Sequence, residues 1–243
     1  MIWPPFITLE ACCGAVLGSF VTTAAMRRAA GRPWARGSSQ CDGCGTRLGF
    51  YQTLPVVSYL GTRGRCSACG GAINPLHPLG EIAGALIVTS AFSLSANWAA
   101  IVTCALGLSL LYATIYDLLT LTIPNALNAL ILTLGGLQAF LAGRFWEGLA
   151  SGALIYVAIN LIRHLFAHFA GREGLGGGDV KLLAAVAFGV GAQSFSFLLI
   201  CAAGLALLWV VVARIKGRSV TRLPFAPFVG LGWGLVFVGA ALA

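Results

Sequence analysis

The chain has 243 residues, of which 58% are hydrophobic and only 9% are charged, against about 25% charged residues in an ordinary soluble domain. Together with a mean hydropathy of +0.90, this excludes a soluble domain and indicates an all-α protein that crosses a membrane several times. The net charge of +8 does not indicate nucleic-acid binding, because the basic residues are not interleaved with exposed aromatic residues along one soluble face.

Apolar runs along the chain predict eight transmembrane helices, since about 20 apolar residues are needed to cross the hydrocarbon core. We expect these helices at residues 6–26, 79–97, 99–119, 124–142, 147–168, 179–193, 195–213 and 225–243. The first run is followed by arginines and does not end in a signal-peptidase site, so we interpret it as a retained helix. The predicted domains are the first helix at 1–26, a loop domain at 27–78 and a seven-helix membrane domain at 79–243.

The basic residues predict the orientation of the chain. All but one of the 15 lysines and arginines fall in loops on one side of the predicted membrane, and Arg144 is the exception. The others are Arg27, Arg28, Arg32, Arg36, Arg47, Arg63, Arg65, Arg163, Arg172, Lys181, Arg214, Lys216, Arg218 and Arg222. Because basic loops face the cytoplasm, the loop domain is expected in the cytoplasm and both termini outside. Binding of these loops to membrane lipid gives the same orientation.

Asp117 and Asp179 are two of only three aspartates, and each lies at the end of a predicted span. Carboxylates at membrane depth are costly and mark candidate functional sites. Two spans lie between the two aspartates, so both are expected near the cytoplasmic boundary. Two facing carboxyl groups share a proton, so one can take a proton from water while the other donates one to a carbonyl oxygen. This predicts an aspartic-peptidase pair, with helix capping by Asp179 and an interfacial position for Asp117 as the alternatives.

Three glycines, Gly176, Gly177 and Gly178, directly precede Asp179. Glycines adopt backbone geometries closed to other residues and let an extended peptide approach closely, so we expect these three to support the substrate. Glu81 is a further acid at membrane depth, one turn into the second predicted span. It either orients the substrate or binds its amino end, or it only pairs with a loop arginine, and the sequence does not decide between these roles.

Four cysteines of the loop domain form two CxxC pairs separated by 21 residues: Cys41, Cys44, Cys66 and Cys69. Each pair offers two thiolates from one tight turn, and two such turns complete a closed tetrahedral zinc site. A pair of disulfides is disfavoured in a reducing cytoplasm, and redox-active CxxC motifs are disfavoured because the sequence has no thioredoxin-like pattern. We therefore predict a structural zinc ion that folds this loop, because some 50 residues with few large apolar groups build little core.

Several ordered motifs over nearly the whole chain resemble the type IV prepilin peptidase family, membrane aspartic peptidases of the GxGD class. These are Gly18-Ser19-Phe20, the double CxxC, Pro55-Val56-Val57-Ser58-Tyr59-Leu60, Arg63-Gly64-Arg65-Cys66, His77-Pro78 with Glu81, Asp117 with Ile123-Pro124-Asn125, Gly176-Gly177-Gly178-Asp179-Val180-Lys181, and Pro224-Phe225-Ala226-Pro227-Phe228. By this resemblance Asp117 and Asp179 are the catalytic acids of a bacterial inner-membrane enzyme. The resemblance implies cleavage of the basic leader of prepilins or pseudopilins on the cytoplasmic side. It also implies that S-adenosylmethionine-dependent N-methylation can follow.

Two other classes of function compete with the peptidase. In a transporter, the same aspartates would relay protons or bind a cation, and in a non-enzymatic assembly factor the zinc loop would dock a partner. The sequence offers no glycine-rich nucleotide-binding unit, so the site of the methyl donor stays unassigned.

Overall fold

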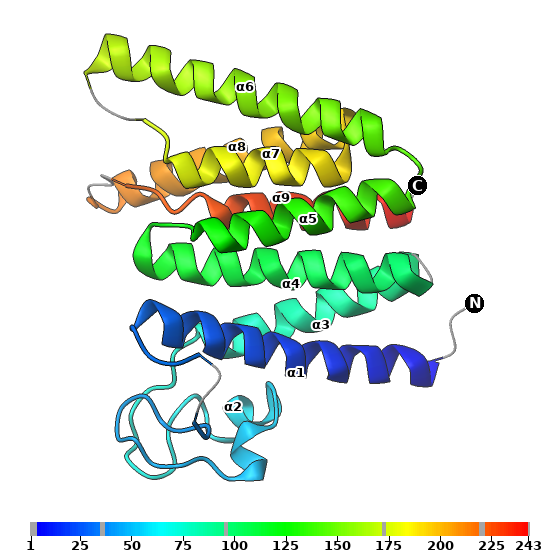
Figure 1. Cartoon of the computed structure of the whole chain (residues 1–243). Helices are drawn as coiled ribbons and strands as arrows, with labels where there is room; N and C mark the ends of the chain where they lie inside the picture. Colours follow the sequence, from blue (N-terminus) through cyan, green and yellow to red (C-terminus); the bar gives the residue numbers. More distant parts are fainter. Residues whose placement is uncertain (1–3, 35–36, 95–96, 172–173, 219–221, 243) are drawn as a thin grey trace. The chain divides into compact units, whose positions relative to one another are not determined.

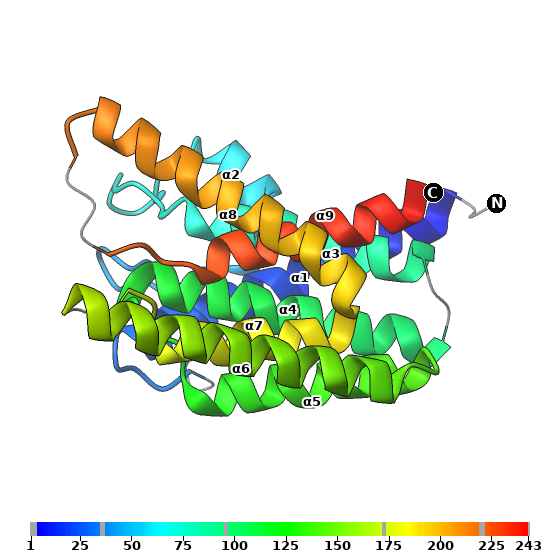
Figure 2. The same cartoon turned by 90° about the horizontal axis from the view of Figure 1, so that it is seen from above.

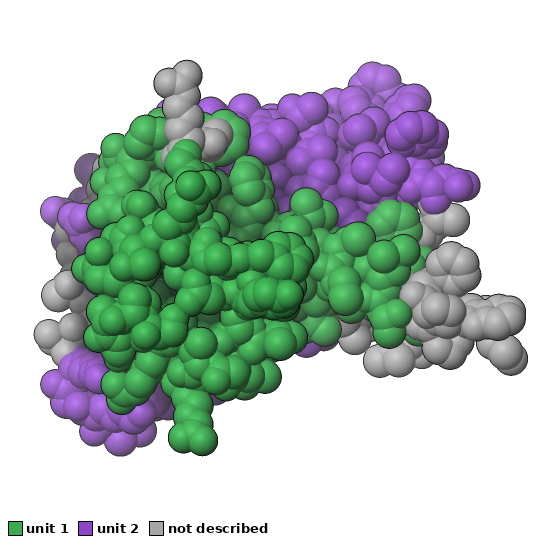
Figure 3. All heavy atoms as spheres, turned by 90° about the horizontal axis from the view of Figure 1, so that it is seen from below, with its two compact units in different colours: residues 1–93 green, residues 94–243 purple. Residues whose placement is uncertain are grey.

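The computed structural model describes residues 4–34, 37–94, 97–171, 174–218 and 222–242, and within them the chain is helical and contains no strand (Figure 1). The predicted all-α class is therefore confirmed. Arg36 and Arg172, which contribute to the predicted orientation, lie outside the described residues. The chain divides into two compact units, residues 1–93 and 94–243, which Figure 3 colours green and purple. The predicted domain boundaries after residues 26 and 78 stay a prediction.

The first unit contains two long helices and a loop region between them. Helix α1 (Pro4–Ala29) precedes the loop, which carries the short helices η1 (Phe50–Thr53) and α2 (Val57–Gly61), and α3 (Leu76–Leu94) follows it. The loop otherwise has only two isolated bridges among its described residues. This agrees with its sequence, which is too poor in large apolar groups to form a core of its own.

Glycines let α1 and α3 approach closely. A Cβ on Gly14 would lie 2.5 Å from the carbonyl oxygen of Gly84, and a Cβ on Gly84 would lie 2.6 Å from the Cα of Gly18. Gly18 in turn faces the backbone of Gly80. Small residues four apart on both helices are the usual device for close helix packing in membranes, where apolar burial gives no drive to associate. The Gly18 motif noted in the sequence thus has a packing role.

The second unit is a bundle of six helices: α4 (Asn97–Thr120), α5 (Asn125–Leu141), α6 (Phe145–Ala170), α7 (Gly177–Val190), α8 (Ala192–Ile215) and α9 (Ala226–Leu242). Helix α7 packs against α5 and α6, as Figures 1 and 2 show, and it also contacts α8 and α9. Ten of its 14 residues are buried, so it is the central helix of this unit.

Each of the eight predicted spans corresponds to one helix, in order α1 and α3 to α9. Four helices in the described part of the chain are long and apolar enough to cross a membrane, at Ile7–Ala29, Asn97–Thr120, Phe145–Ala170 and Ala192–Ile215. Shorter apolar helices are α5 and the Ala226–Phe237 part of α9. Helix α7 is about 21 Å long, less than the hydrocarbon core of about 30 Å, which suits a helix enclosed by others.

Candidate active site

Asp117 lies in the last turn of α4 and is buried, with 3% of its surface exposed. Its Oδ2 accepts a hydrogen bond from the backbone N–H of Ala226, over 3.0 Å, and the backbone of Phe225 contributes another. Ala226 is the first residue of α9, where N–H groups have no partner within the helix and favour a carboxylate. The segment around Pro224 therefore holds Asp117 through backbone N–H groups. The side chains of this segment give no indication of that role.

Asp179 lies in the first turn of α7 and is half-buried. Its carboxyl group accepts a hydrogen bond from the backbone of Gly176, the N-cap residue. This resembles the acidic half of a capping box, with Asp179 three residues after the N-cap and not at the N-cap position itself. The charge of Asp117 also acts on the carboxyl group of Asp179. The two aspartates that the span count paired are therefore electrostatic neighbours within one unit.

The three glycines do not have the unusual backbone that the sequence led us to expect. Gly176 has φ −67° and ψ 143°, while Gly177 and Gly178 are helical, and none of the three has a positive φ. What they provide is space. A Cβ on Gly176 would lie 3.0 Å from Oδ2 of Asp179, and one on Gly178 would lie 3.4 Å from the Cβ of Ile123. Gly176 thus leaves room for the carboxyl group to fold back onto the helix start.

Asn128 is a buried residue of α5 that the sequence reasoning missed. Its Nδ2 donates a hydrogen bond to the carbonyl oxygen of Gly178, over 3.2 Å, directly before Asp179. Next to it, Nζ of Lys181 donates to Oδ1 of Asn125 over 2.7 Å. Helix α5 therefore holds the start of α7. The available signal was an amide inside an apolar run, which needs a partner when it is buried.

Glu81 belongs to the first unit and is buried. Its Oε1 accepts a hydrogen bond from Oγ of Ser19 over 2.8 Å, and its Oε2 accepts one from the backbone N–H of Val56 over 2.7 Å. Two donors from the first unit thus hold the carboxylate, and among the described residues no arginine is seen to pair with it, so its role stays as open as the sequence left it. Val56 has φ 61°, a region that β-branched residues rarely adopt, so this contact fixes an unusual turn at the start of α2.

The four loop cysteines come together as their spacing predicts. All four Sγ atoms lie within 4.8 Å of one another, and those of Cys41 and Cys69 are 4.0 Å apart. Both CxxC turns have the same backbone bonds: Gly45 N–H donates to Cys41 O, and Gly70 N–H donates to Cys66 O. In a tetrahedral zinc site with Zn–S near 2.3 Å the sulfurs lie about 3.8 Å apart, so a small contraction of this cluster fits a metal ion.

The thiols of the cluster differ in acidity. Hydrogen bonds from the side chain and backbone of Thr46 lower the pKa of Cys44 to about 6. The backbone N–H of Gly71 lowers the pKa of Cys69, but the neighbouring thiols of Cys44 and Cys66 outweigh it and raise that pKa to about 11. Crowded thiols that resist losing all their protons are expected where a divalent cation supplies the missing positive charge.

Two family models match the chain: the bacterial peptidase A24 N-terminal domain over residues 12–94 and the type IV leader peptidase family over residues 104–211. A prepilin leader peptidase/N-methyltransferase of Pseudomonas putida is 32% identical over 96% of this chain and 91% of its own length. The chain belongs to the type IV leader peptidase family. The predicted family and its enzymatic nature are thereby confirmed, and nothing in the matches supports the transporter or the assembly factor.

Other members of the type IV leader peptidase family cover the chain to a similar extent. A protein of the same name from Dichelobacter nodosus is 34% identical over 84% of this chain and 72% of its own length. One from Bacillus subtilis is 28% identical over 93% and 91%. No solved structure matches. Both aspartates fall inside the match to the type IV leader peptidase model, whereas Ala226, which holds Asp117, lies beyond its end at residue 211.

Proposed function

We propose that this chain is a membrane aspartic endopeptidase that removes the leader peptide of prepilin or pseudopilin precursors, with Asp117 and Asp179 as its catalytic acids. The observation that carries the proposal is the electrostatic interaction between two carboxyl groups that are withdrawn from solvent, one in the last turn of α4 and one in the first turn of α7 of the same unit. The names of the relatives supply the substrate class. Membership of the type IV leader peptidase family supplies the reaction class.

The pair acts on a water molecule and a peptide bond. The ionised carboxylate takes a proton from water as the oxygen attacks the scissile carbonyl carbon, and the protonated partner donates its proton to the carbonyl oxygen. Collapse of the resulting diol breaks the C–N bond, and the amine leaves with a proton from the pair. Gly177 and Gly178 let the extended peptide approach this site, because a helical substrate hides its amide bond.

The decisive test is cleavage of a coexpressed prepilin by Asp117→Asn and Asp179→Asn variants. Each keeps the shape of the side chain and removes its acid, so we expect cleavage to fall by a factor of about 10³ or more, in the range of lost general acid–base catalysis and electrostatics together. Asp42→Asn is the matched control, since Asp42 is the third aspartate, is exposed and has the side chain of His77 as its partner. Full cleavage by either active-site variant would rule the pair out.

The cysteine cluster is proposed to bind one structural zinc ion. Its donor set of four thiol groups is typical of structural zinc, and the two matching turns present the sulfurs on one side. When bound, the ion supplies the cross-link that the loop lacks as a hydrophobic core. Elemental analysis of protein purified from a reducing cytosol should give about one zinc per chain. Absence of zinc from such protein would refute this assignment.

N-methylation of the new amino terminus is proposed from the names of the relatives alone. The cavity between α5, α6 and α7 does not fit S-adenosylmethionine, because its only charged lining residue is Lys181 and a cation repels the sulfonium group. No residue is therefore assigned to methyl transfer. Mass spectrometry of the processed pilin reports the cleavage position and any added methyl group together.

The proposed location is the bacterial inner membrane, with the loop domain and both aspartates at the cytoplasmic side and both termini outside. The excess of basic residues in the loops supports this orientation. Reporter fusions after residues 60 and 243 test it, because a reporter active only in the periplasm should be active at the second position and silent at the first. The opposite pattern would invert the topology.

A further inference from the structure

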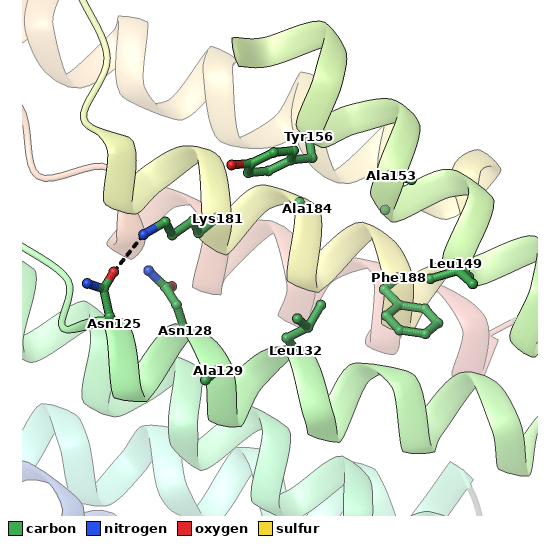
Figure 4. A pocket seen from close by; sticks show the side chains of 11 residues that line it. Asn125, Asn128, Ala129, Leu132, Leu149, Ala153, Tyr156, Lys181, Ala184 and Phe188 are labelled. Atoms are coloured by element: carbon green, nitrogen blue, oxygen red, sulfur yellow. Dashed lines mark hydrogen bonds between the residues drawn. The ribbon is translucent and has the colours of Figure 1, made fainter.

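A cavity of about 450 Å³ lies behind the catalytic helix, between α5, α6 and α7 (Figure 4). Lys181 and Asp179 are two positions apart on α7, so their side chains leave the helix in nearly opposite directions. The cavity is therefore separate from the site of the aspartate pair. Its walls are apolar except at one end, where Lys181, Asn125, Asn128 and Tyr156 gather.

The polar end contains a buried acceptor without a partner. Asn128 is 4% exposed, and while its Nδ2 donates to Gly178, its Oδ1 is buried and accepts no hydrogen bond from the described residues. A buried polar atom of this kind is costly, and a ligand that donates a hydrogen bond removes the cost. Lys181 adds an exposed ammonium group beside it, held by Asn125.

The opposite end is built for a hydrocarbon chain. Leu132 of α5, Leu149 of α6 and Phe188 of α7 line it, and both leucines are more than 40% exposed. From Asn125 to Leu132 the cavity runs about 10 Å along the helix axes. Polar groups at one end and apolar groups about 10 Å deeper match the order of headgroup and acyl chain in a bilayer leaflet.

The size of the cavity excludes a helical segment of the substrate, and its charge disfavours a cationic ligand. Two turns of an α-helix about 10 Å wide occupy about 850 Å³, so a transmembrane segment of a substrate does not fit into the cavity. A cationic ligand is disfavoured by Lys181, which has no carboxylate beside it among the lining residues. An anionic headgroup complements that lysine, and a hydroxyl group on the headgroup can donate to Asn128.

We propose that this cavity is a binding site for one anionic phospholipid with hydroxyl groups on its headgroup, namely phosphatidylglycerol. Its phosphate binds the ammonium group of Lys181, a headgroup hydroxyl donates to Oδ1 of Asn128, and one acyl chain follows Leu132 and Phe188. The bound lipid packs against the face of α7 that lies opposite Asp179. The proposal rests on membrane embedding and not on the peptidase activity, so either can fail alone.

Native mass spectrometry of the delipidated full chain in detergent tests this proposal. We expect one tightly retained phosphatidylglycerol per chain, and about fivefold weaker retention of phosphatidylcholine with the same acyl chains, the usual effect of one lysine on an anionic lipid. Lys181→Gln should remove this preference, whereas Lys216→Gln, at the other lysine of the chain, should keep it. Equal retention of both lipids by the unsubstituted chain would overturn the proposal.

A second pair of variants tests the cavity itself. Ala153→Phe places a ring in the cavity and should abolish tight retention of either lipid. Leu154→Phe adds a ring on the same helix at a residue that is 66% exposed and does not line the cavity, so it should have no effect. Unchanged retention by Ala153→Phe would refute the site. Displacement of the lipid by inorganic phosphate, or by a lipid-free prepilin precursor, would also refute it. Gel-filtration elution verifies that each variant is folded.

Discussion

Replacement of Gly176 by alanine separates the two explanations for the glycines before Asp179. Gly176 has backbone angles that any residue adopts, so the substitution introduces no backbone strain. Its Cβ would lie 3.0 Å from Oδ2 of Asp179, a few tenths of an ångström closer than an ordinary contact. The carboxyl group must therefore move by that amount. Since a displacement of 1 Å in an active site costs about 10²-fold in rate, we expect kcat for prepilin cleavage to fall about tenfold with little change in KM.

Two alanine variants serve as controls in the same cleavage assay. A Cβ on Gly177 would lie 3.5 Å from Nη1 of Arg163, an ordinary contact that leaves Asp179 in place. If Gly177 serves the approach of the peptide, Gly177→Ala raises KM and leaves kcat intact. Gly204 of α8 has no atom within 4 Å of its Cβ position, so Gly204→Ala should change neither constant. An unaltered kcat in Gly176→Ala would refute the carboxyl contact.

Three further outcomes follow from the packing. Gly84→Ala places a methyl group 2.6 Å from the Cα of Gly18, so α1 and α3 must separate, and the melting temperature should fall by an amount that reflects about 1–3 kcal/mol of overpacking. Cys66→Ser should lower the zinc content of the purified protein, whereas Cys201→Ser, outside the cluster, should not. Asn128→Leu removes an unpartnered acceptor but leaves Gly178 O without its donor, so stability should change little while cleavage falls. Asn160→Leu should leave cleavage unchanged, because the side chain of Asn160 is only half-buried and bonds within α6.

The sequence predicted the helices well because each is an apolar run bounded by loops, and membrane insertion depends mainly on that property. The order of spans also predicts that Asp117 and Asp179 lie on one side of the membrane, and the electrostatic interaction between them supports this pairing. The CxxC spacing located all four sulfurs of the cluster, since each turn fixes two of them locally. Each of these predictions depends only on the local sequence pattern and on the number of times the chain crosses the membrane.

Contacts made by backbone atoms could not be predicted in the same way. The N–H of Ala226 that holds Asp117 comes from a residue 109 positions away, and an alanine side chain carries no sign of this role. The bond from Asn128 to Gly178 depends on how α5 packs on α7, which the apolar pattern leaves open. By contrast, the glycines of α1 and α3 did carry a readable signal, since residues 14 and 18 and residues 80 and 84 each form a GxxxG pair.

Arg144, the one basic residue on the predicted outer side, has a structural reason to be there. Its Nη2 donates a hydrogen bond to the carbonyl oxygen of Gly189 over 2.6 Å, in the last turn of α7. A cation at a helix C-terminus satisfies carbonyl groups and complements the helix dipole. Asn128 binds the other end of the same helix through Gly178. Helix α7 is therefore held at both ends by side chains from neighbouring segments, and because it is too short to be anchored by the membrane interfaces, these two bonds fix the depth of Asp179. Arg144, the exception to the charge rule, thus helps to position Asp179.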